Sequence, residues 1–479
     1  MPASAAHTNL RRWWLPGLGA IAAFAAGIAL ELPALFALPF VAVVVPRIVQ
    51  VEVKHLFFLL LFFIPLSTEL EVGGSLSTDV PDEPVMLLLT GALLGYFLLH
   101  PRRFPAAAAR SSVVALLVLQ LAWIFLTVIF SHNTVVSLKY LLAKTWYLVP
   151  FILGTLVFLQ RREDFIKAGL LLVAGLSIPV VASLVQHAPH GFSFESVNDT
   201  LHPFFRNHVS YSAMIAFLLP ILFAGQHLST GRTRKLFILL IILFTAALFF
   251  AYSRGAWLAV IAGVFTWWAV RRRQLLNLLA LSVILAVIGV TWLIRDDNFM
   301  RFAPDFNKTY FRTDFSEHMA ATYELKDIST MERFYRWVAG VRMVKEEPVT
   351  GFGPNTFYYH YKHYAVAAFK TWVSENKERS TVHNYFLLLA IEQGFPGLVL
   401  FVALLFLLFR LALRAYHRLT DPFDQALAML CAVILSMIVV LNLLSDLIET
   451  DKVGGLFFLV TGVLVYLENR MREKQGLKE

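Results

Sequence analysis

The chain has 479 residues, of which 58% are hydrophobic and only 15% charged, and this composition excludes an ordinary soluble globular domain. Its formal net charge of +9 does not indicate nucleic-acid binding, because the basic residues cluster in short connections between apolar runs. The runs are continuously apolar rather than alternating, which excludes membrane-spanning strands. They have the roughly 16 to 22 residues that a helix needs to cross a bilayer, so the sequence predicts an all-α polytopic membrane protein.

The apolar runs predict about 12 to 14 transmembrane helices, depending on whether the shortest runs are counted. Arg11 and Arg12 precede the first run, but no small-residue cleavage site follows it, so we expect a retained span rather than a signal peptide. In chain order the runs are 14–30, 34–50, 55–67, 85–100, 112–131, 144–160, 166–186, 208–225, 236–251, 255–270, 276–294, 383–410, 425–445 and 454–467.

Every second connection carries the Lys and Arg residues expected of a cytoplasmic loop, while the alternate connection around residues 68–83 is acidic. This alternation puts both termini in the cytoplasm and the one long hydrophilic segment on the outer face. The predicted division is an N-terminal transmembrane bundle of about eleven spans (1–294), an outer loop domain bearing short helices (295–382), and C-terminal transmembrane helices with a cytoplasmic tail (383–479).

A surface helix is predicted within the loop, because a Ser-x-x-Glu capping box at 329–332 begins a helical run over 330–346 that a proline ends. Arg333, Arg336 and Trp337 recur at i, i+3 and i+4, so two guanidinium groups and an indole share one helix face. Such a face suits a bidentate hold on a diphosphate. A solvated face, or one that meets lipid headgroups, is the alternative.

Two further features lie near the end of the loop. The glycines of Thr350-Gly-Phe-Gly-Pro predict a tight turn whose backbone amides can face an anion. His383 and Asn384 begin the twelfth run, where the partial positive charge of a helix N-terminus favours neutral imidazole. Neutral imidazole is the form that a general base for a sugar hydroxyl must have. An interfacial histidine that only caps or anchors the helix is the alternative.

Other cations are expected at the same outer boundary. Arg254 lies between two apolar runs joined by almost no loop, and an ionisable group at that depth is a functional candidate unless it snorkels to the headgroups. Arg206 and His208 open the eighth span, and Lys144 in the sixth span adds a further positive charge. Together these residues predict a cationic outer surface.

Acidic residues within the apolar runs are few, and they include Glu392 and Asp446, for which packing against polar neighbours is the alternative to a functional role. The adjacent pairs at 296–297 and 346–347 lack the spacing of metal ligands. We therefore predict no metal site and no cofactor.

Four patterns occur in order along the second half of the chain: Ser253-Arg254-Gly255-Ala256; Arg333-x-x-x-Trp337; Pro348-Val-Thr-Gly-Phe-Gly with Asn355 and Phe357; and His383-Asn384-Tyr385 leading to Glu392-Gln-Gly-Phe-Pro-Gly397. With the large outer loop, these patterns resemble the O-antigen ligase and O-antigen polymerase superfamily of bacterial inner membranes. The resemblance covers residues 200–410, and the first six spans match only in hydropathy.

The resemblance implies transfer of a glycan from undecaprenyl diphosphate to a hydroxyl acceptor, the lipid A core of lipopolysaccharide, at the periplasmic face and without a metal. Arg254 and Arg333 would then hold the diphosphate as leaving group, and His383 would deprotonate the acceptor hydroxyl, with inversion of the anomeric centre. The remaining substrate-binding residues would be Arg206, His208, Arg336, Trp337 and Asn384.

The acceptor stays open at this point. The predicted number of spans exceeds that of the ligases, and Arg206-Asn207-His208 replaces an Asn-rich turn of the family. Repeat-unit polymerases and protein O-oligosaccharyltransferases share the same motifs, so a polymerase is the alternative function. A transporter would place polar groups in the middle of its spans, whereas these cations gather at one boundary.

Overall fold

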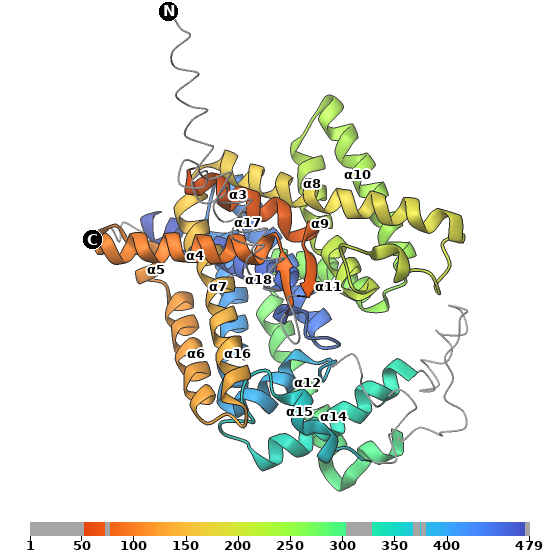
Figure 1. Cartoon of the computed structure of the whole chain (residues 1–479). Coiled ribbons are helices and arrows are strands. Elements are labelled where there is room, and N and C mark those ends of the chain that lie inside the picture. The colour runs from red at the N-terminus through yellow and green to blue at the C-terminus, as the bar shows by residue number, and fades with distance from the viewer. Residues whose placement is uncertain (1–51, 72–76, 303–327, 367–373, 375–379, 475–479) are drawn as a thin grey trace, which may run out of the picture.

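The computed structural model describes residues 52–71, 77–302, 328–366, 374 and 380–474, which form an almost entirely helical protein (Figure 1). The predicted spans 14–30 and 34–50 lie outside the described residues. Each other predicted span corresponds to a helix: α3 (Val53–Phe63), α4 (Asp82–Leu99), α6 (Ser112–Ile129), α7 (Thr134–Phe158), α8 (Arg162–His187), α9 (His208–Leu228), α10 (Gly231–Phe250), α11 (Arg254–Arg271), α12 (Leu275–Ile294), α16 (Tyr385–Arg418), α17 (Pro422–Asn442) and α18 (Asp451–Lys474).

Among the described residues, nine helices are long and apolar enough to cross a membrane. On α12 the whole apolar stretch faces outward, as a helix surrounded by lipid does. The predicted class, an all-α polytopic membrane protein, is confirmed. In Figure 1, α6, α7 and α16 run side by side, and the helices of the loop lie beyond their lower ends.

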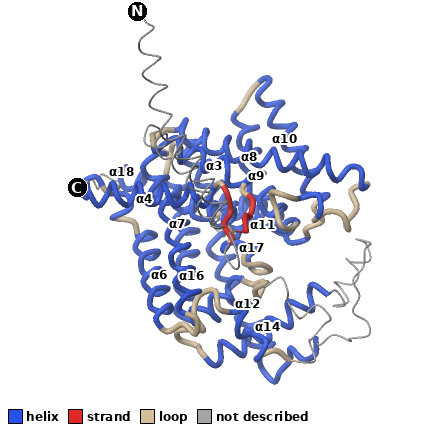
Figure 2. Tube along the Cα trace, viewed as in Figure 1, coloured by secondary structure: helices blue, strands red, loops and turns tan. Residues whose placement is uncertain are grey.

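Short elements connect these helices. Two strands, β1 (Thr68–Glu71) and β2 (Ser77–Val80), pair as an antiparallel hairpin within the acidic connection (Figure 2). The remaining short helices are η2 (Ile64–Leu66), η3 (Pro101–Arg103), α5 (Ala106–Ala109), η4 (Ala188–His190), η5 (Asp199–Leu201), η6 (Arg295–Phe302), α14 (Ile328–Glu346), α15 (Phe357–His360), η8 (Tyr361–His363) and η10 (Leu447–Glu449).

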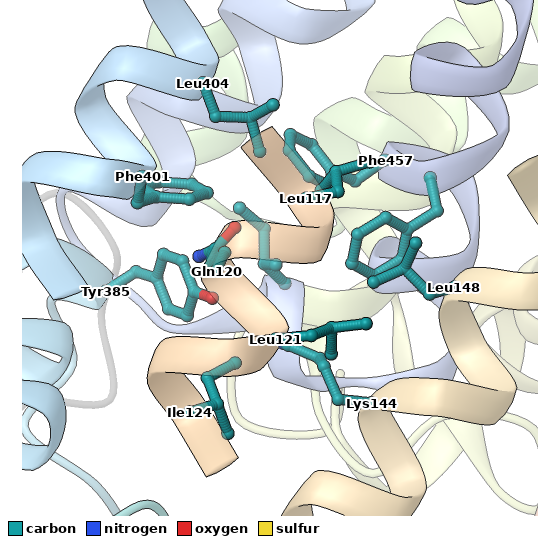
Figure 3. A pocket seen from close by; sticks show the side chains of 12 residues that line it. Leu117, Gln120, Leu121, Ile124, Lys144, Leu148, Tyr385, Phe401, Leu404 and Phe457 are labelled. Carbon is teal, nitrogen blue, oxygen red and sulfur yellow. The ribbon is translucent and has the colours of Figure 1, made fainter. Parts of the chain in front are cut away.

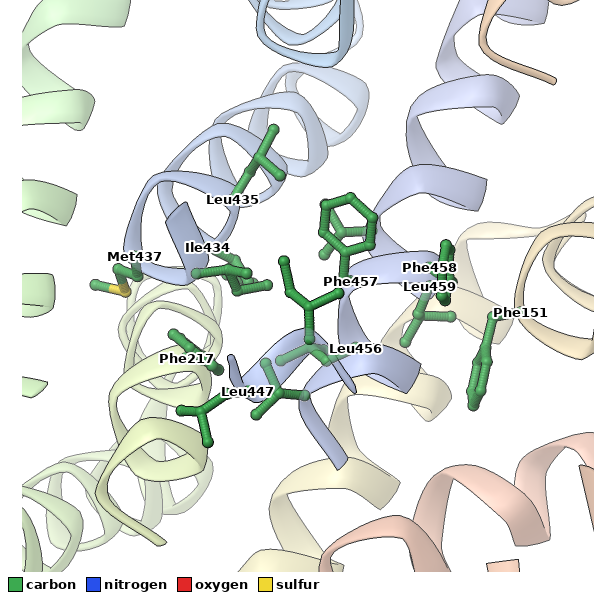
Figure 4. Close-up of a cluster of buried hydrophobic side chains, with 14 of the residues drawn as sticks. Phe151, Phe217, Ile434, Leu435, Met437, Leu447, Leu456, Phe457, Phe458 and Leu459 are labelled. Carbon is green, nitrogen blue, oxygen red and sulfur yellow. The ribbon is translucent and has the colours of Figure 1, made fainter. Parts of the chain in front are cut away.

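The centre of the molecule is formed by α17 and α18. Helix α17 packs against α9, α11 and α16, and α18 packs against α7. Figure 4 shows the apolar side chains that fill this centre, among them Phe217 from α9, Ile434 from α17 and Phe457 from α18. At Gly462 a Cβ would lie 2.6 Å from the Phe151 carbonyl oxygen, so α18 and α7 approach more closely than a larger residue allows. Close backbone approach through small residues is typical of helix packing in membranes.

The start of α7 differs from the prediction. A span from residue 144 was expected, but α7 begins at Thr134, where the Asn133 side chain caps the helix by accepting from the Val136 backbone N–H. Lys144 lies inside the helix with its Nζ 2.9 Å from Glu449 Oε1. Because Glu449 balances its charge, Lys144 is accommodated inside the helix. It is therefore not part of the predicted cationic outer surface.

The predicted helix of the loop is confirmed as α14, with two corrections. The helix begins at Ile328, so Ser329 lies in its first turn rather than in front of it as a cap. It is also not a surface helix, because Tyr335, Ala339 and Met343 are buried and α14 packs against α16. The hydrophobic contacts fix α14 to the part of α16 that follows His383.

Candidate active site

Residues 381–385, called the His383 segment below, join the loop to α16 and are held from two directions. From α14, Arg336 Nη1 donates a hydrogen bond of 3.2 Å to the Thr381 carbonyl, and Trp337 Nε1 donates one of 3.0 Å to the Val382 carbonyl. Two adjacent residues of one helix therefore bind two successive carbonyls directly before His383. Buried carbonyls need such partners, so this contact fixes the path of the backbone.

The second set of contacts comes from the connection between α17 and α18, residues 443–450. Asn384 Nδ2 donates to the Leu443 carbonyl over 3.1 Å, and the Tyr385 backbone N–H donates to the Ser445 carbonyl over 3.0 Å. Asn384 Oδ1 also accepts from the Leu387 backbone N–H and so caps α16. Both ends of the Asn384 amide are thus used within the protein, and the geometry does not support its predicted role in substrate binding.

His383 has a left-handed backbone conformation, with φ of 53°, which residues other than glycine rarely adopt. Its ring Nδ1 lies 3.9 Å from Asp446 Oδ1, and its side chain remains 35% exposed. Such a conformation persists where surrounding contacts impose it, and it is common at functional sites. The contacts of the His383 segment therefore direct the imidazole toward Asp446 and leave part of the ring accessible.

The electrostatic setting keeps the imidazole neutral. Burial lowers the pKa of His383, and the guanidinium groups of Arg336 and Arg333 lower it further, to about 3. Burial raises the pKa of Asp446 to about 6; a hydrogen bond from Thr381 opposes the rise and Glu449 adds to it. At neutral pH His383 is neutral and Asp446 is ionised. The lowered pKa agrees with the predicted neutral imidazole, and its cause is burial beside two arginines rather than the helix N-terminus.

The predicted face of α14 exists, but its three members differ in environment. Arg336 is buried, with its Nη2 3.4 Å from Glu332 Oε2 and its Nη1 bonded to the Thr381 carbonyl, and its Nε has no hydrogen-bond partner among the described residues. The single donor of Trp337 bonds the Val382 carbonyl, so substrate binding through the indole N–H is not supported, whereas the predicted role of Arg336 in binding substrate stays a prediction. Arg333 is half-buried and close enough to lower the pKa of His383. This position agrees with its predicted role at the diphosphate.

Arg254 is the first residue of α11 and lies at the same end of the molecule as His383. A Cβ on the adjacent Gly255 would lie 3.1 Å from Leu441 Cδ2, at the end of α17. Two residues further along the chain, Leu443 accepts the hydrogen bond from Asn384. Arg254 and the His383 segment therefore flank the C-terminal end of α17. Arg254 itself lies at the N-terminus of α11, where the helix adds partial positive charge.

Arg206 and His208 contact a different group of residues. Arg206 Nη2 lies 2.7 Å from Glu69 Oε1 and 4.0 Å from Asp79 Oδ2 of the β-hairpin. The backbone N–H and ring Nδ1 of His208 both lie 3.0 Å from Asn198 Oδ1. Because two carboxylates already surround Arg206, the structure opposes its predicted use as a diphosphate ligand. His208 is likewise placed beside the connection that precedes α9, and its predicted role in binding substrate stays untested.

The glycine turn does present backbone amides to a carboxyl group, but this group is that of Glu392 in α16. The N–H groups of Asn355 and Phe357 donate to its carboxylate oxygens over 2.8 and 3.1 Å. Two further amides of the turn donate to α16 carbonyls over 2.9 and 3.0 Å. These carbonyls are available because α16 is broken at Gly394, where φ is 66°. The turn is therefore a structural clamp between the loop and α16.

Asp446 is the site residue whose role the sequence indicated least. It was noted as an embedded acid, but nothing in the sequence pattern pairs it with His383. The signal that finds it is the hydrogen-bonded contact between the His383 segment and residues 443–445. Within the part of the chain that the structure describes, no group of three or more His, Cys, Asp or Glu residues is arranged to hold a metal ion.

Two comparisons with known proteins bear on the family. Residues 236–402 match the family model described as O-antigen ligase. The chain is also 25% identical, over 377 residues, to a protein named O-antigen ligase from Salmonella typhimurium strain LT2, and the match covers 77% of this chain and 86% of that relative. Both matches support the O-antigen ligase superfamily, which the motifs of this chain resemble.

The segment that matches the O-antigen ligase model holds most of the candidate site. It contains Arg254, Arg333 and the His383 segment, whereas Arg206 precedes it and Asp446 follows it. The two matches support a glycosyl-transferring, ligase-like enzyme of lipopolysaccharide biosynthesis. Because the matched residues include both α14 and the start of α16, this segment carries the contacts from α14 that hold the His383 segment, whereas Leu443 and Ser445 follow it.

Proposed function

We propose that this protein transfers a glycan from undecaprenyl diphosphate to a hydroxyl of the lipid A core, at the periplasmic face of the bacterial inner membrane. The observation that carries the proposal is a neutral His383 placed beside Asp446 and Arg333, with all but Asp446 in the segment that matches the O-antigen ligase model. The basic connections on alternate sides support cytoplasmic termini and a periplasmic loop over residues 295–382.

The reaction needs one base and a stabilised leaving group. The acceptor oxygen attacks the anomeric carbon, its proton passes to His383, and the bond from that carbon to the diphosphate oxygen breaks, with inversion. Because His383 Nδ1 faces Asp446, Nε2 is the nitrogen left for the acceptor hydroxyl. Asp446 then stabilises the imidazolium that forms. Arg333 and Arg254 balance the charge that develops on the undecaprenyl diphosphate as it leaves.

Binding of the donor makes His383 a better base by raising its pKa. In the structure His383 has a pKa of about 3, partly because Arg336 and Arg333 are close to it. A diphosphate bound at Arg333 neutralises part of this positive charge and raises the pKa of the imidazole toward the working pH, where a general base is most effective. Proton transfer is therefore favoured only when the donor is in place. We further propose that no metal ion takes part, so chelation with EDTA should leave the rate unchanged.

The direct test uses purified protein in detergent with undecaprenyl-diphosphate glycan and lipid A core. Release of the undecaprenyl diphosphate and appearance of glycosylated core are both measured. Arg254→Ala and Arg333→Ala should each abolish transfer without loss of folded protein, because both guanidinium groups act on one leaving group. Arg342→Ala is the matched control, since Arg342 is an exposed arginine of the same helix as Arg333. Full activity of Arg254→Ala or Arg333→Ala would remove that residue from the site.

The acceptor is decided by deletion of the gene. A ligase defect leaves long chains on the carrier that never reach the outer leaflet, whereas a defect in a repeat-unit polymerase leaves single repeats attached to core. We expect the first outcome, because both the matching family model and the relative carry the name O-antigen ligase. Single repeats on core would show a polymerase instead.

A further inference from the structure

Lys144 is a buried cation of α7, with a side chain only 8% exposed, and its charge is balanced inside the protein. Its Nζ lies 2.9 and 3.0 Å from the two carboxylate oxygens of Glu449. Tyr140, one turn earlier on α7, donates its hydroxyl to the same carboxylate over 3.0 Å. Lys144 Nζ also lies 5.2 and 6.0 Å from the ring centroids of Tyr140 and Tyr385. Four side chains from three elements thus meet around one ion pair.

The surroundings of this ion pair are apolar. Figure 3 shows Lys144 and Tyr385 at a small cavity between α6, α7, α16 and α18, whose lining includes Leu117, Leu148 and Phe401. In such surroundings the attraction between two charges is stronger than in water, and removal of one partner leaves a costly unpaired charge. The pair is therefore a firm attachment point between α7 and Glu449.

Glu449 transmits this attachment to Asp446. Both residues belong to the connection between α17 and α18, where the Glu449 backbone N–H donates to the Asp446 carbonyl over 3.0 Å and closes the turn of η10. The opposite end of the connection is held by the His383 segment through Leu443 and Ser445. Asp446 lies between the two attachments, so its distance from His383 depends on both.

We propose that Lys144 and Glu449 form a clamp that sets the position of Asp446 against His383, which makes them positioning residues for the transfer reaction. This inference rests on the proposed function, in which His383 is the general base. It assigns Lys144 a purpose other than donor binding, since the lysine is enclosed and bonded to Glu449.

The clamp formed by Lys144 and Glu449 predicts a distinctive change in the pH dependence of the transfer reaction. Among the described residues, the charged and titratable groups that interact with Asp446 include His383, Arg336, Glu449 and Glu392, and Thr381 adds a hydrogen bond. Removing the lysine leaves the Glu449 charge uncompensated, which raises the pKa of Asp446; removing the Glu449 charge lowers it. A merely looser packing would not move the pKa in opposite directions in the two variants.

The test compares Lys144→Met, Glu449→Gln and the double variant with the wild type in the purified transfer assay. For Lys144→Met we expect kcat to fall roughly tenfold with an unchanged KM for the lipid-linked donor. The acid limb of kcat/KM should move to higher pH in Lys144→Met and to lower pH in Glu449→Gln. Lys144→Arg should recover most of the lost kcat. Lys139→Met is the matched control, because Lys139 is an exposed cation of the same helix and should behave as wild type.

A second measurement needs no activity. Cysteines introduced at positions 383 and 446 are joined by a short bis-methanethiosulfonate cross-linker, and the buried Cys431 stays in place. Cross-linking should fall severalfold when Lys144→Met is added, and stay unchanged with Lys139→Met. The double variant Lys144→Met/Glu449→Gln leaves no unpaired buried charge and should show the same loss if the single variant fails to fold.

The outcomes separate the two proposals. His383→Gly is measured in parallel, and full activity of that variant would overturn the proposed function while the cross-linking still tests the clamp. If His383→Gly is inactive but Lys144→Met keeps the wild-type kcat, pH profile and cross-linking, the clamp is wrong. A raised donor KM with unchanged kcat in Lys144→Met would show a donor-binding lysine and overturn the clamp as well.

Discussion

Replacement of Trp337 by phenylalanine tests whether α14 positions the general base or binds the donor. The Trp337 Nε1–H bonds the Val382 carbonyl over 3.0 Å, and Val382 is fully buried, so this carbonyl has no water to replace its partner. Phenylalanine keeps a ring next to Phe334 but removes the donor. Leaving a buried carbonyl unpaired costs about 1 to 3 kcal/mol. If the His383 segment relaxes to recover that energy, kcat falls by about 5- to 150-fold, since 1.36 kcal/mol corresponds to a factor of ten.

The assay is steady-state transfer with varied lipid-linked donor. A positioning role predicts a lower kcat with the donor KM near the wild-type value, because the indole itself does not touch the donor. Trp123→Phe is the matched control, since the Trp123 indole donates a similar bond of 2.9 Å to the Gln393 carbonyl at the break in α16. A raised donor KM with unchanged kcat in Trp337→Phe would refute the positioning role and show that Trp337 binds the donor.

Three further predictions follow from the site. Glu392→Gln keeps only one carbonyl oxygen for the backbone amides of Asn355 and Phe357, so the variant should be destabilised by about 1 to 3 kcal/mol and its loop should become sensitive to limited proteolysis. Wild-type protection would argue against the attachment of the glycine turn to α16. Asp446 has a pKa of about 6 and must be ionised for transfer, so wild-type kcat/KM should decline as the pH falls through 6. Asp446→Asn should lack this decline, and an unchanged decline in that variant would assign it to another group. Arg206 is 63% exposed in its ion pair with Glu69, so Arg206→Gln should change stability by less than about 1 kcal/mol and leave the donor KM unchanged, whereas a tenfold rise in KM would make it a donor ligand.

The spans were predictable because they depend on local composition. A run of apolar residues long enough for the bilayer becomes a helix wherever it lies in the chain, and α9 to α12 agree with their predicted bounds to within a few residues. The prediction was wrong at the start of α7, because the polar residues Lys139 and Lys144 interrupt the apolar run over the first turns of this helix. Lys144 is compatible with a buried helix only because Glu449, from the far end of the chain, supplies its counter-charge.

The candidate site was predictable in part, for the same reason. The helix that carries Arg333 follows from nearby residues. The neutral state of His383 was expected from its place at a helix N-terminus, but its cause in the structure is burial beside Arg336 and Arg333, which are distant in the sequence. The roles of Arg336, Trp337 and Glu392 do not follow from nearby residues, because each depends on a partner that lies 35 or more residues away in the sequence. A diphosphate and a buried carboxylate or carbonyl attract the same donors, so donor residues alone do not reveal whether their partner belongs to the substrate or to the protein.

The most direct test of the account is chemical rescue of the general base. His383→Gly is the appropriate variant, because glycine adopts the φ of 53° without strain and leaves space for added imidazole. If His383 is the general base, transfer falls by about 10²- to 10⁴-fold in this variant and imidazole restores part of it, with a dependence on the fraction of neutral imidazole. Transfer by His383→Gly at the wild-type rate, with no response to imidazole, would contradict the assignment of His383 as the base.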